Sequence, residues 1–353
     1  MPAPSTGPAR EDLRSDHTPA VHPLLRARAD RQLGLFTALD ARTAGYGHGE
    51  IRSLCTTGAW VRVRRGVYAL ADEHAAALAG GRAHALAATA VLLDLGRPDT
   101  VVSHSSAFRL LGLPARRALL PDTVRLTHPT LWRRGQGFTV NRAPLPVDDV
   151  RQHPPLWLTT PARTLVDCGR EWPLEDAVIG MDAALLAEKL SPAQLHEAVT
   201  RAEGWPGARR AARAAGLADG RAESPLETRG RLRMIGAGLP VPELQVEIRV
   251  QGRLLGVVDA WFEEAALAVE FDGQVKYTDP WRGRTAERVL WEEKRREDAM
   301  RAVGIRFVRV VDADMGAGWP EVETRLAQLL STPGPPRRTF TATPRPRGVV
   351  RTA

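Results

Sequence analysis

The chain has 353 residues, 43% of them hydrophobic, which is enough for two or three domains with cores of their own. Lysine and arginine together number 49 against 41 acidic residues, and this excess of cations, mostly arginine, favours a polyanionic partner such as nucleic acid. The two cysteines, Cys55 and Cys168, are far apart in the sequence, which excludes a disulfide framework and a cysteine zinc site.

No segment of the chain predicts a membrane contact. The longest apolar run, residues 83–96, is too short and too rich in alanine to span a bilayer. Residues 1–25 are polar and contain prolines, so they lack the apolar core of a signal peptide and predict a disordered tail. The proline- and arginine-rich residues 332–353 predict a second, basic disordered tail. We therefore expect a cytoplasmic protein.

Residues 26–72 predict a DNA-binding module. Apolar positions at helical spacing indicate one helix over residues 33–45, with Thr37 as its cap, and a second helix over residues 46–58. Residues 60–70 alternate between apolar and basic side chains, which is typical of a β-hairpin. Two helices followed by a basic hairpin form a winged helix-turn-helix, whose second helix enters the major groove. The residues expected to bind nucleic acid are Arg52, Arg62, Arg64 and Arg65.

Several segments carry a resemblance to a known family. LFTALDARTAG, EIRSL and GAWVRVRRGVYAL resemble the winged-helix domain at the N-terminus of AbiEi-type antitoxins from abortive-infection systems. Further along, SHSSAFRLLGL and TTPARTLVDCG resemble the part of the same family that follows the winged helix. The resemblance implies a DNA-binding regulator that is paired with a toxin protein. The alternative for the N-terminal module is a small interaction domain whose basic hairpin is merely solvated.

A middle region, residues 75–215, predicts an α+β arrangement with less chemistry. A helix is expected over residues 84–95, and a later pair of helices is separated by Pro173. His104 lies among serines and could form a nucleophilic triad with Asp167, but no G-x-S-x-G elbow is present and serines before a helix are usually caps. We expect this region to pack, to form a homodimer or to brace the other two domains.

The C-terminal part, residues 222–331, predicts an α/β domain with a mixed sheet. Two apolar runs, 257–262 and 267–272, are joined by a short polar link and predict a hairpin. A helix precedes this hairpin, and a second helix follows it before a strand at residues 305–311. A domain boundary is expected near residues 216–222. The fold class is therefore multi-domain α/β.

Four acidic residues of this domain stand in positions that suggest a metal site. Ser224 and Glu227 have the spacing of a capping box at the start of the first helix. Alternate residues of a strand share a face, so Glu270 and Asp272 point the same way and the hairpin brings Asp259 beside them. Carboxylates that lie so close together are tolerated when they bind a hard cation such as Mg²⁺ or Mn²⁺. We therefore expect Asp259, Glu270 and Asp272 to share one metal-binding pocket.

The same stretch resembles the restriction-endonuclease-like core, written PD-(D/E)xK. The resemblance rests on the order of helix, hairpin, helix and strand and on the segments SPLETRGRLRMIGAGLP and GVVDAWFEEAALAVEFDGQ. More narrowly, the stretch resembles a branch of this group that is related to very-short-patch repair endonucleases. It implies phosphodiester hydrolysis with divalent metal bound by Glu227, Asp259 and Glu270.

The chain departs from that pattern at two positions. Val258 stands where the pattern has proline, and Asp272 stands where it has lysine, so Lys276 or Lys294 would have to supply the catalytic cation. This leaves two functions open: a metal-dependent deoxyribonuclease, or a non-enzymatic antitoxin or transcriptional regulator with an inactive nuclease-like fold. For each acid the alternative role is structural, as a helix cap, a strand end or part of an Asp-Gly turn.

Overall fold

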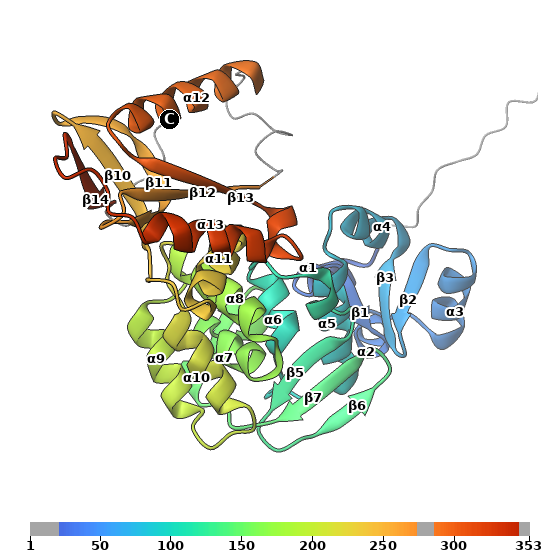
Figure 1. The fold of residues 1–353 in the computed structure, drawn as a ribbon. Helices are drawn as coiled ribbons and strands as arrows, with labels where there is room; N and C mark the ends of the chain where they lie inside the picture. The colour runs from blue at the N-terminus through green and yellow to red at the C-terminus, as the bar shows by residue number, and fades with distance from the viewer. Residues whose placement is uncertain (1–20, 274–285, 346–353) are drawn as a thin grey trace, which may run out of the picture. The chain divides into compact units, whose positions relative to one another are not determined.

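The computed structural model describes residues 21–273 and 286–345, and Figure 1 shows their helices and strands. The part of the chain so described contains no helix that is long and apolar enough to cross a membrane. The chain divides into two compact units, and each is treated by itself below. The first unit comprises residues 1–100 and 152–156, and the second comprises residues 101–151 and 157–353.

The first unit contains a winged helix-turn-helix. Its strands form a three-stranded antiparallel sheet in the order β1-β3-β2, and three helices precede the β2–β3 hairpin (Figure 1). The elements are α1 (Pro23–Asp30), β1 (Leu35–Thr37), α2 (Ala38–Thr43), α3 (His48–Thr56), β2 (Trp60–Arg64), β3 (Val67–Leu70), α4 (Ala71–Ala79) and α5 (Ala83–Leu95).

The helix expected over residues 33–45 is shorter than predicted. Leu35 and Phe36 are fully buried and pair with β3 as strand β1, so tertiary pairing overrides their helical spacing. Helix α2 begins only after Thr37, whose hydroxyl accepts a hydrogen bond from the backbone N–H of Asp40, 3.0 Å away. The Asp40 carboxylate in turn accepts from the backbone N–H of Thr37 at 2.8 Å. This capping box confirms the predicted cap.

An aromatic core holds the winged helix together and reaches into the segment expected to be disordered. The rings of Phe36 and Trp60 meet edge to face at 4.7 Å, and Tyr46 packs against Trp60 at 5.0 Å. Leu25 of α1 belongs to the same core and is almost fully buried. The expectation of a disordered tail up to residue 25 is therefore wrong from Pro23 onward, because α1 supplies one side of this core; residues 1–20 lie outside the described part.

The first unit extends beyond the predicted end of the DNA-binding module at residue 72. Helix α5 confirms the helix expected over residues 84–95. Its residues Leu86 and Ala90 pack against Leu35 and Val67 of the three-stranded sheet. A helix that the sequence pattern placed in the middle region thus completes the core under the winged helix.

The second unit begins with a six-stranded mixed sheet and a cluster of helices. The sheet order is β6-β7-β5-β4-β9-β8. The helices pack around the edge-to-face pair Phe108 and Trp172, whose ring centres are 4.7 Å apart, and the predicted break at Pro173 separates α7 from α8. The elements are β4 (Val101–Val102), α6 (His104–Leu110), β5 (Val124–His128), β6 (Arg133–Gly135), β7 (Phe138–Arg142), β8 (Val150–His153), β9 (Leu156–Thr159), α7 (Pro161–Glu171), α8 (Leu174–Leu186), α9 (Pro192–Arg201) and α10 (Ala208–Leu217).

The C-terminal part of the second unit is built on a five-stranded mixed sheet in the order β13-β12-β11-β10-β14. Strands β12 and β13 are parallel and the other pairs are antiparallel. The predicted hairpin and the predicted last strand are confirmed, whereas β10 was not predicted. The elements are α11 (Pro225–Gly236), β10 (Glu243–Val250), β11 (Arg253–Phe262), β12 (Leu267–Asp272), α12 (Ala286–Ala302), β13 (Arg306–Val311), α13 (Trp319–Leu330) and β14 (Phe340–Pro344).

Strand β14 lies inside residues 332–353, which were expected to be a disordered tail. It pairs with β10 along its whole length, from Val250 opposite Phe340 to Val246 opposite Pro344. The Phe340 ring packs edge to face on Trp261 at 5.9 Å. The prediction of a disordered tail is therefore wrong for these residues. Backbone pairing with β10 and packing of the Phe340 ring on Trp261 order the segment, although its composition favours disorder.

Helices cover both faces of this sheet. Val269 and Phe271 of β12 pack in one core with residues of α11 and α13. Ala268 belongs to a second core with Met300 of α12 and Phe307 of β13. Figure 1 shows α12 on one side of the sheet and α11 and α13 on the other. Alternate residues of β12 thus serve two cores, as a strand buried on both faces requires.

A buried ion pair joins the middle helices to the C-terminal sheet domain. Asp182 of α8 accepts hydrogen bonds from the guanidinium of Arg231 at 2.9 Å and the hydroxyl of Thr228 at 2.8 Å, both on α11. It also accepts from the backbone N–H of Asp219 at 2.7 Å. Burial raises the pKa of Asp182 to about 6 in spite of the nearby arginine. Hydrogen bonds to Asp182 therefore hold the segment at the expected boundary, residues 216–222, against α8 and α11.

We predict that Asp182→Ala lowers the free energy of unfolding by about 3 kcal/mol, because it leaves the Arg231 guanidinium buried without its carboxylate. Urea unfolding of the full chain measures this loss. Glu197→Ala removes the exposed one of the two carboxylates that pair with Arg201 and should cost less than about 1 kcal/mol. Equal losses in the two variants would contradict the structural role given to Asp182.

Candidate functional site

Helix α3 presents a polar face to solvent that carries one acidic and one basic side chain. Ile51 is buried, and Leu54 and Cys55 pack toward the aromatic core of the winged helix. This anchoring leaves the opposite face of the helix exposed, and its residues follow a spacing of three or four positions. The exposed residues of α3 are His48, Gly49, Glu50, Arg52, Ser53 and Thr56, so the carboxylate of Glu50 offsets the charge of Arg52. Of these only Arg52 was expected from the sequence; the helical spacing of polar side chains around it was the available signal.

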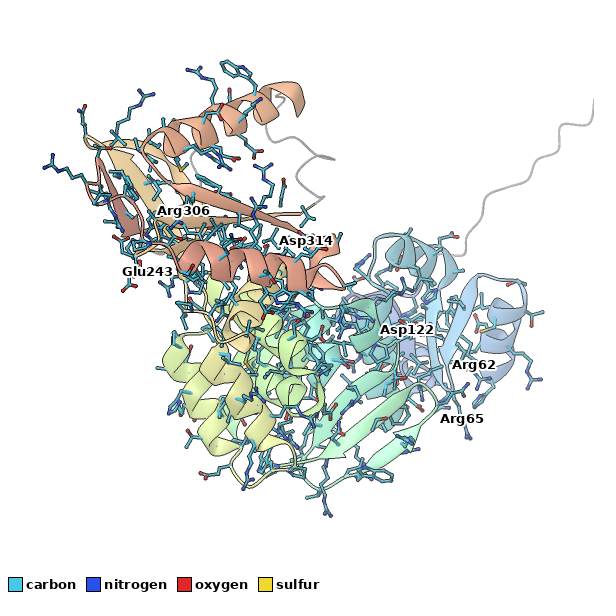
Figure 2. The ribbon with its side chains drawn as sticks, in the orientation of Figure 1. Arg62, Arg65, Asp122, Glu243, Arg306 and Asp314 are labelled. Atoms are coloured by element: carbon cyan, nitrogen blue, oxygen red, sulfur yellow. The ribbon has the colours of Figure 1, made fainter. Side chains whose placement is uncertain are left out.

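The hairpin after α3 carries two exposed arginines rather than three. Figure 2 shows Arg62 and Arg65 on the β2–β3 hairpin, and both side chains are exposed. Arg64 instead forms an ion pair with Asp94 of α5, with Nε 2.8 Å from the carboxylate. The register of β2 against β3 shifts between Arg62 and Arg64, so the simple alternation assumed from the sequence does not hold there. Of the three hairpin arginines, only Arg62 and Arg65 are therefore exposed for the expected phosphate contacts.

Glu227 lies at the buried start of α11. The Ser224 hydroxyl accepts a hydrogen bond from the backbone N–H of Glu227 at 3.2 Å, which confirms Ser224 as the cap. The Glu227 carboxylate accepts from the backbone N–H of Glu223 at 2.8 Å and from the amide nitrogen of Gln245 at 3.0 Å. The side chain is thus oriented by α11, by the preceding turn and by β10, and the residue is only 5% exposed.

Asp259 sits where the hairpin strands stop pairing. Strands β11 and β12 are in register from Phe262 opposite Leu267 to Ala260 opposite Val269. Immediately beyond, the Asp259 carboxylate accepts a hydrogen bond from the backbone N–H of Phe271 at 2.8 Å. A side-chain oxygen therefore takes the place of a backbone acceptor, and this fixes a carboxylate, 1% exposed, at the end of the ladder.

Glu227, Asp259 and Gln245 form an oxygen-rich site, which we call the acid pair with Gln245. Burial raises the pKa of Glu227 to about 7, and the nearby charge of Asp259 acts in the same direction. Gln245 is 3% exposed, and in the described part of the chain its amide oxygen has no hydrogen-bond partner. Two carboxyl groups and a buried amide oxygen are ligands suited to Mg²⁺ or Mn²⁺. These residues therefore fit a hard cation.

Gln245 was not among the residues expected from the sequence. The signal was a single amide inside the otherwise apolar and charged strand sequence ELQVEIRV. Its backbone has a φ of 53°, which non-glycine residues rarely adopt and which places it outside the regular alternation of β10. Backbone strain of this kind is held by the surrounding packing and is concentrated at functional sites.

Glu270 and Asp272 are arranged differently from the acid pair. Both line a cavity of about 20 Å³ under α12, which is room for about one water molecule. Asp272 lies 3.7 Å from the guanidinium of Arg309 on β13, and Glu270 is opposite the same arginine in the parallel register. Their shared face is as expected, but each has a cation nearby in the protein.

The three-carboxylate pocket expected of Asp259, Glu270 and Asp272 is not assembled. Within residues 21–273 and 286–345, no group of three or more histidine, cysteine, aspartate or glutamate side chains is placed to hold a metal ion. The physical reason is that the Asp259 carboxylate is held by the Phe271 backbone N–H, near Glu227, whereas Asp272 lies 3.7 Å from the Arg309 guanidinium. Metal binding itself stays a prediction, with the acid pair and Gln245 as its ligands.

The cation expected near these acids is not Lys294. Its side chain is on the exposed side of α12, whereas Arg296, two residues later, lines the cavity with Glu270. Lys276 lies outside the described residues. Arg296 and Arg309 are thus the cations that sequence reasoning overlooked, since arginine does not match the lysine of the PD-(D/E)xK pattern.

The histidine and serines of the middle region do not form a nucleophilic triad. The Ser103 hydroxyl and the Asp167 carboxylate both approach Nδ1 of His104, at 2.8 and 4.0 Å, while Nε2 is 3.6 Å from Glu171. Burial lowers the pKa of His104 to about 3, so the ring is neutral. Ser103 is fully buried at the N-cap position of α6, but its side chain makes no capping hydrogen bond and instead accepts from the Thr127 hydroxyl at 2.7 Å, so the capping interpretation is wrong for this residue.

Comparison with known families identifies the N-terminal module. Residues 23–71 match the family model described as "Transcriptional regulator, AbiEi antitoxin". The matched segment runs from α1 to the end of β3, so it contains α3 and the hairpin with Arg62 and Arg65. The N-terminal module is therefore similar to a domain of that family.

Two curated proteins and one solved structure are also similar to this chain. Two curated proteins from two strains of Mycobacterium tuberculosis, "Uncharacterized protein MT2308" and "Uncharacterized protein Rv2248", are each 31% identical over 172 residues. The match covers 49% of this chain and 61% of the length of each relative. The crystal structure of the RV2827C protein from Mycobacterium tuberculosis aligns with a TM-score of 0.36 at 18% identity, over 58% of this chain and 78% of that one.

We predict that stability depends on the protonation of Glu227. Its pKa is about 7 in the folded protein against 4.5 as an ordinary carboxyl, so the folded state binds the proton more tightly than the unfolded state. The stability that this proton provides is present below pH 4.5 and is lost as pH rises to 7, by about 3 kcal/mol. Urea unfolding across this range, in the presence of EDTA, compares wild type with Glu227→Gln.

Glu227→Gln should remove this part of the pH dependence, whereas Glu321→Gln, on the exposed face of α13, should leave it in place. If the two variants show the same pH profile, the Glu227 carboxyl is not the group that titrates.

Proposed function

We propose that this protein is a DNA-binding transcriptional regulator of the antitoxin type. The observation that carries the proposal is the exposed face of α3 beside a hairpin whose tip exposes Arg62 and Arg65. The family match over residues 23–71 supports the same conclusion. A toxin protein as partner, and a homodimer that reads two half-sites, belong to this proposal.

The arrangement assigns separate tasks to the helix and the hairpin. Helix α3 enters the major groove, where the Arg52 guanidinium can bind a guanine edge and the hydroxyls of Ser53 and Thr56 can bind other base edges. Arg62 and Arg65 bind phosphates, which position the domain without reading sequence. Arg64 stays in its ion pair with Asp94 and braces the hairpin against α5.

We predict that replacing Arg62 and Arg65 together by alanine weakens DNA binding across all sequences. The slope of log affinity against log salt concentration should become shallower by up to about 2, at about 0.9 for each phosphate that the variant no longer neutralises. Fluorescence anisotropy at several salt concentrations, with DNA from the region upstream of the protein's own gene, measures this slope.

The control is Arg64→Ala, which removes one positive charge from the same hairpin. Because Arg64 is paired with Asp94, the salt slope of this variant should stay close to that of wild type. A decrease of slope in Arg64→Ala as large as in the double variant would contradict the assignment of the phosphate-binding residues.

The acid pair with Gln245 favours a second function, metal-dependent phosphodiester hydrolysis. Glu227 and Asp259 would hold a Mg²⁺ or Mn²⁺ ion with the amide oxygen of Gln245 as a further ligand. Such an ion lowers the pKa of bound water and neutralises charge on a phosphate. The two functions are compatible, since the winged helix can deliver the second unit to DNA.

We predict that Mn²⁺ raises the thermal stability of the full chain through these ligands. A metal that binds only the folded state contributes about 2.7 kcal/mol at a hundredfold excess over its dissociation constant. The stabilisation should disappear in Asp259→Asn and in Gln245→Leu, each of which loses an oxygen ligand or its charge. Differential scanning calorimetry with Mn²⁺ or EDTA measures it.

Asp272→Asn is the control, because Asp272 lies toward Arg309 and not toward Glu227. It should keep the Mn²⁺ effect. If the effect is lost in Asp272→Asn and kept in Gln245→Leu, the ion is held by the hairpin acids under α12 instead. If wild type shows no effect at all, the acid pair is structural and the protein is a regulator alone.

A further inference from the structure

The C-terminal strand β14 leads directly to the acid pair with Gln245. Its last residue, Pro344, lies opposite Val246 of β10. The next residue, Arg345, donates its backbone N–H to the backbone carbonyl of Gln245 at 2.9 Å. Arg345 therefore supports the backbone of Gln245 at the point where a φ of 53° departs from strand geometry.

The side chain of Arg345 reaches a second part of the same site. Its guanidinium forms an ion pair with the Glu223 carboxylate, and the two side chains are 11% and 25% exposed. Glu223 lies in the segment before α11, 122 residues away in the sequence. This half-buried pair therefore joins the end of β14 to the segment that leads into α11.

Glu223 and Gln245 both orient the Glu227 carboxylate. The backbone N–H of Glu223 donates to it at 2.8 Å, and the amide nitrogen of Gln245 donates to it at 3.0 Å. Both donors reach the same oxygen, Oε2, which is thereby fixed between β10 and the segment before α11. Arg345 thus contacts both donor residues, one through its backbone and one through its side chain.

The charge of Arg345 has the wrong sign for attracting a metal ion. A guanidinium close to the acid pair repels Mg²⁺ or Mn²⁺, so its charge by itself weakens metal binding. Its contacts have the opposite consequence, because a carboxylate that is already oriented loses less freedom when it binds an ion. The two effects differ in sign, and an experiment can therefore separate them.

We propose that Arg345 is a positioning residue for the acid pair with Gln245, so that β14 completes this site from outside residues 222–331. The proposal rests on metal binding at the acid pair, which belongs to the second function proposed above. It adds a means of control, since detaching β14 from β10 loosens the metal site and leaves the DNA-binding residues of the first unit untouched.

The dissociation constant of Mn²⁺ for the full chain tests this proposal, with the free ion measured by electron paramagnetic resonance. Arg345→Ala should weaken Mn²⁺ binding about tenfold, as the loss of groups that orient metal ligands does. Thermal unfolding in EDTA verifies that each variant is folded at the temperature of the measurement. Tighter binding by Arg345→Ala would show that only its charge acts on the site, and would overturn the proposal.

Glu223→Gln breaks the same ion pair from the other side and keeps the backbone N–H that binds Glu227. It should also weaken Mn²⁺ binding, and the double variant should bind no more weakly than the weaker single variant, because both changes remove one link. If Arg345→Ala does not fold, Arg345→Lys takes its place. It keeps the charge but not the planar fork of donors, so weaker Mn²⁺ binding by this variant cannot arise from charge.

Arg338→Ala is the matched control, because Arg338 anchors the other end of the same C-terminal segment. Its guanidinium pairs with Glu263, in the turn between β11 and β12. The variant removes the same charge as Arg345→Ala and should leave the Mn²⁺ affinity unchanged. Equal losses in the two variants would mean that β14 matters only for the fold, and would overturn the proposal.

The same measurement distinguishes this proposal from the second function itself. If wild type binds no Mn²⁺ at millimolar concentration, metal binding at the acid pair and the role of Arg345 are both overturned. If Asp259→Asn abolishes Mn²⁺ binding but Arg345→Ala binds as tightly as wild type, the metal site stands and only the role of Arg345 is overturned.

Discussion

Burying carboxylates is the constraint on which the second unit depends, and three residues satisfy it in different ways. Asp182 is compensated by the Arg231 guanidinium and by two further donors, so its charge joins α8 to α11. Asp259 accepts from the Phe271 backbone and thereby ends the pairing of the hairpin strands. Glu227 is buried among neutral donors beside a like-charged neighbour, and its pKa is raised to about 7. The Asp182 arrangement is structural, whereas Glu227 has no cationic partner among the described residues and could bind a cation.

Gln245 belongs both to the acid pair and to the wall of a cavity of about 590 Å³ in the second unit. Its nitrogen donates to Glu227, its oxygen has no partner within the described residues, and its side chain is part of the cavity wall. The positive φ of Gln245 gives this residue a position that the regular geometry of β10 would not provide.

The first unit uses charge in the opposite way. The arginines that we propose to bind DNA, Arg52, Arg62 and Arg65, remain exposed and cost nothing in desolvation, while Arg64 is paired with Asp94. Helix α5 is part of this domain although it lies beyond the family match, since it supplies the carboxylate that holds the hairpin and the apolar residues under the sheet. A minimal DNA-binding fragment therefore needs residues up to about 100.

By itself, the sequence determined the elements with local signals. The capping box at Thr37, the cap at Ser224, the break at Pro173 and the hairpin of residues 257–272 follow from short-range hydrogen bonds, ring geometry and alternation. Tertiary structure decided the rest. Leu35 and Phe36 became a strand and residues 340–344 joined a sheet because distant partners outweighed local preference. Likewise, Asp259 lies near Glu227 and not near Asp272, and Gln245 donates to the Glu227 carboxylate. Such side-chain neighbours are set by packing between distant parts of the chain, which no spacing along the sequence encodes.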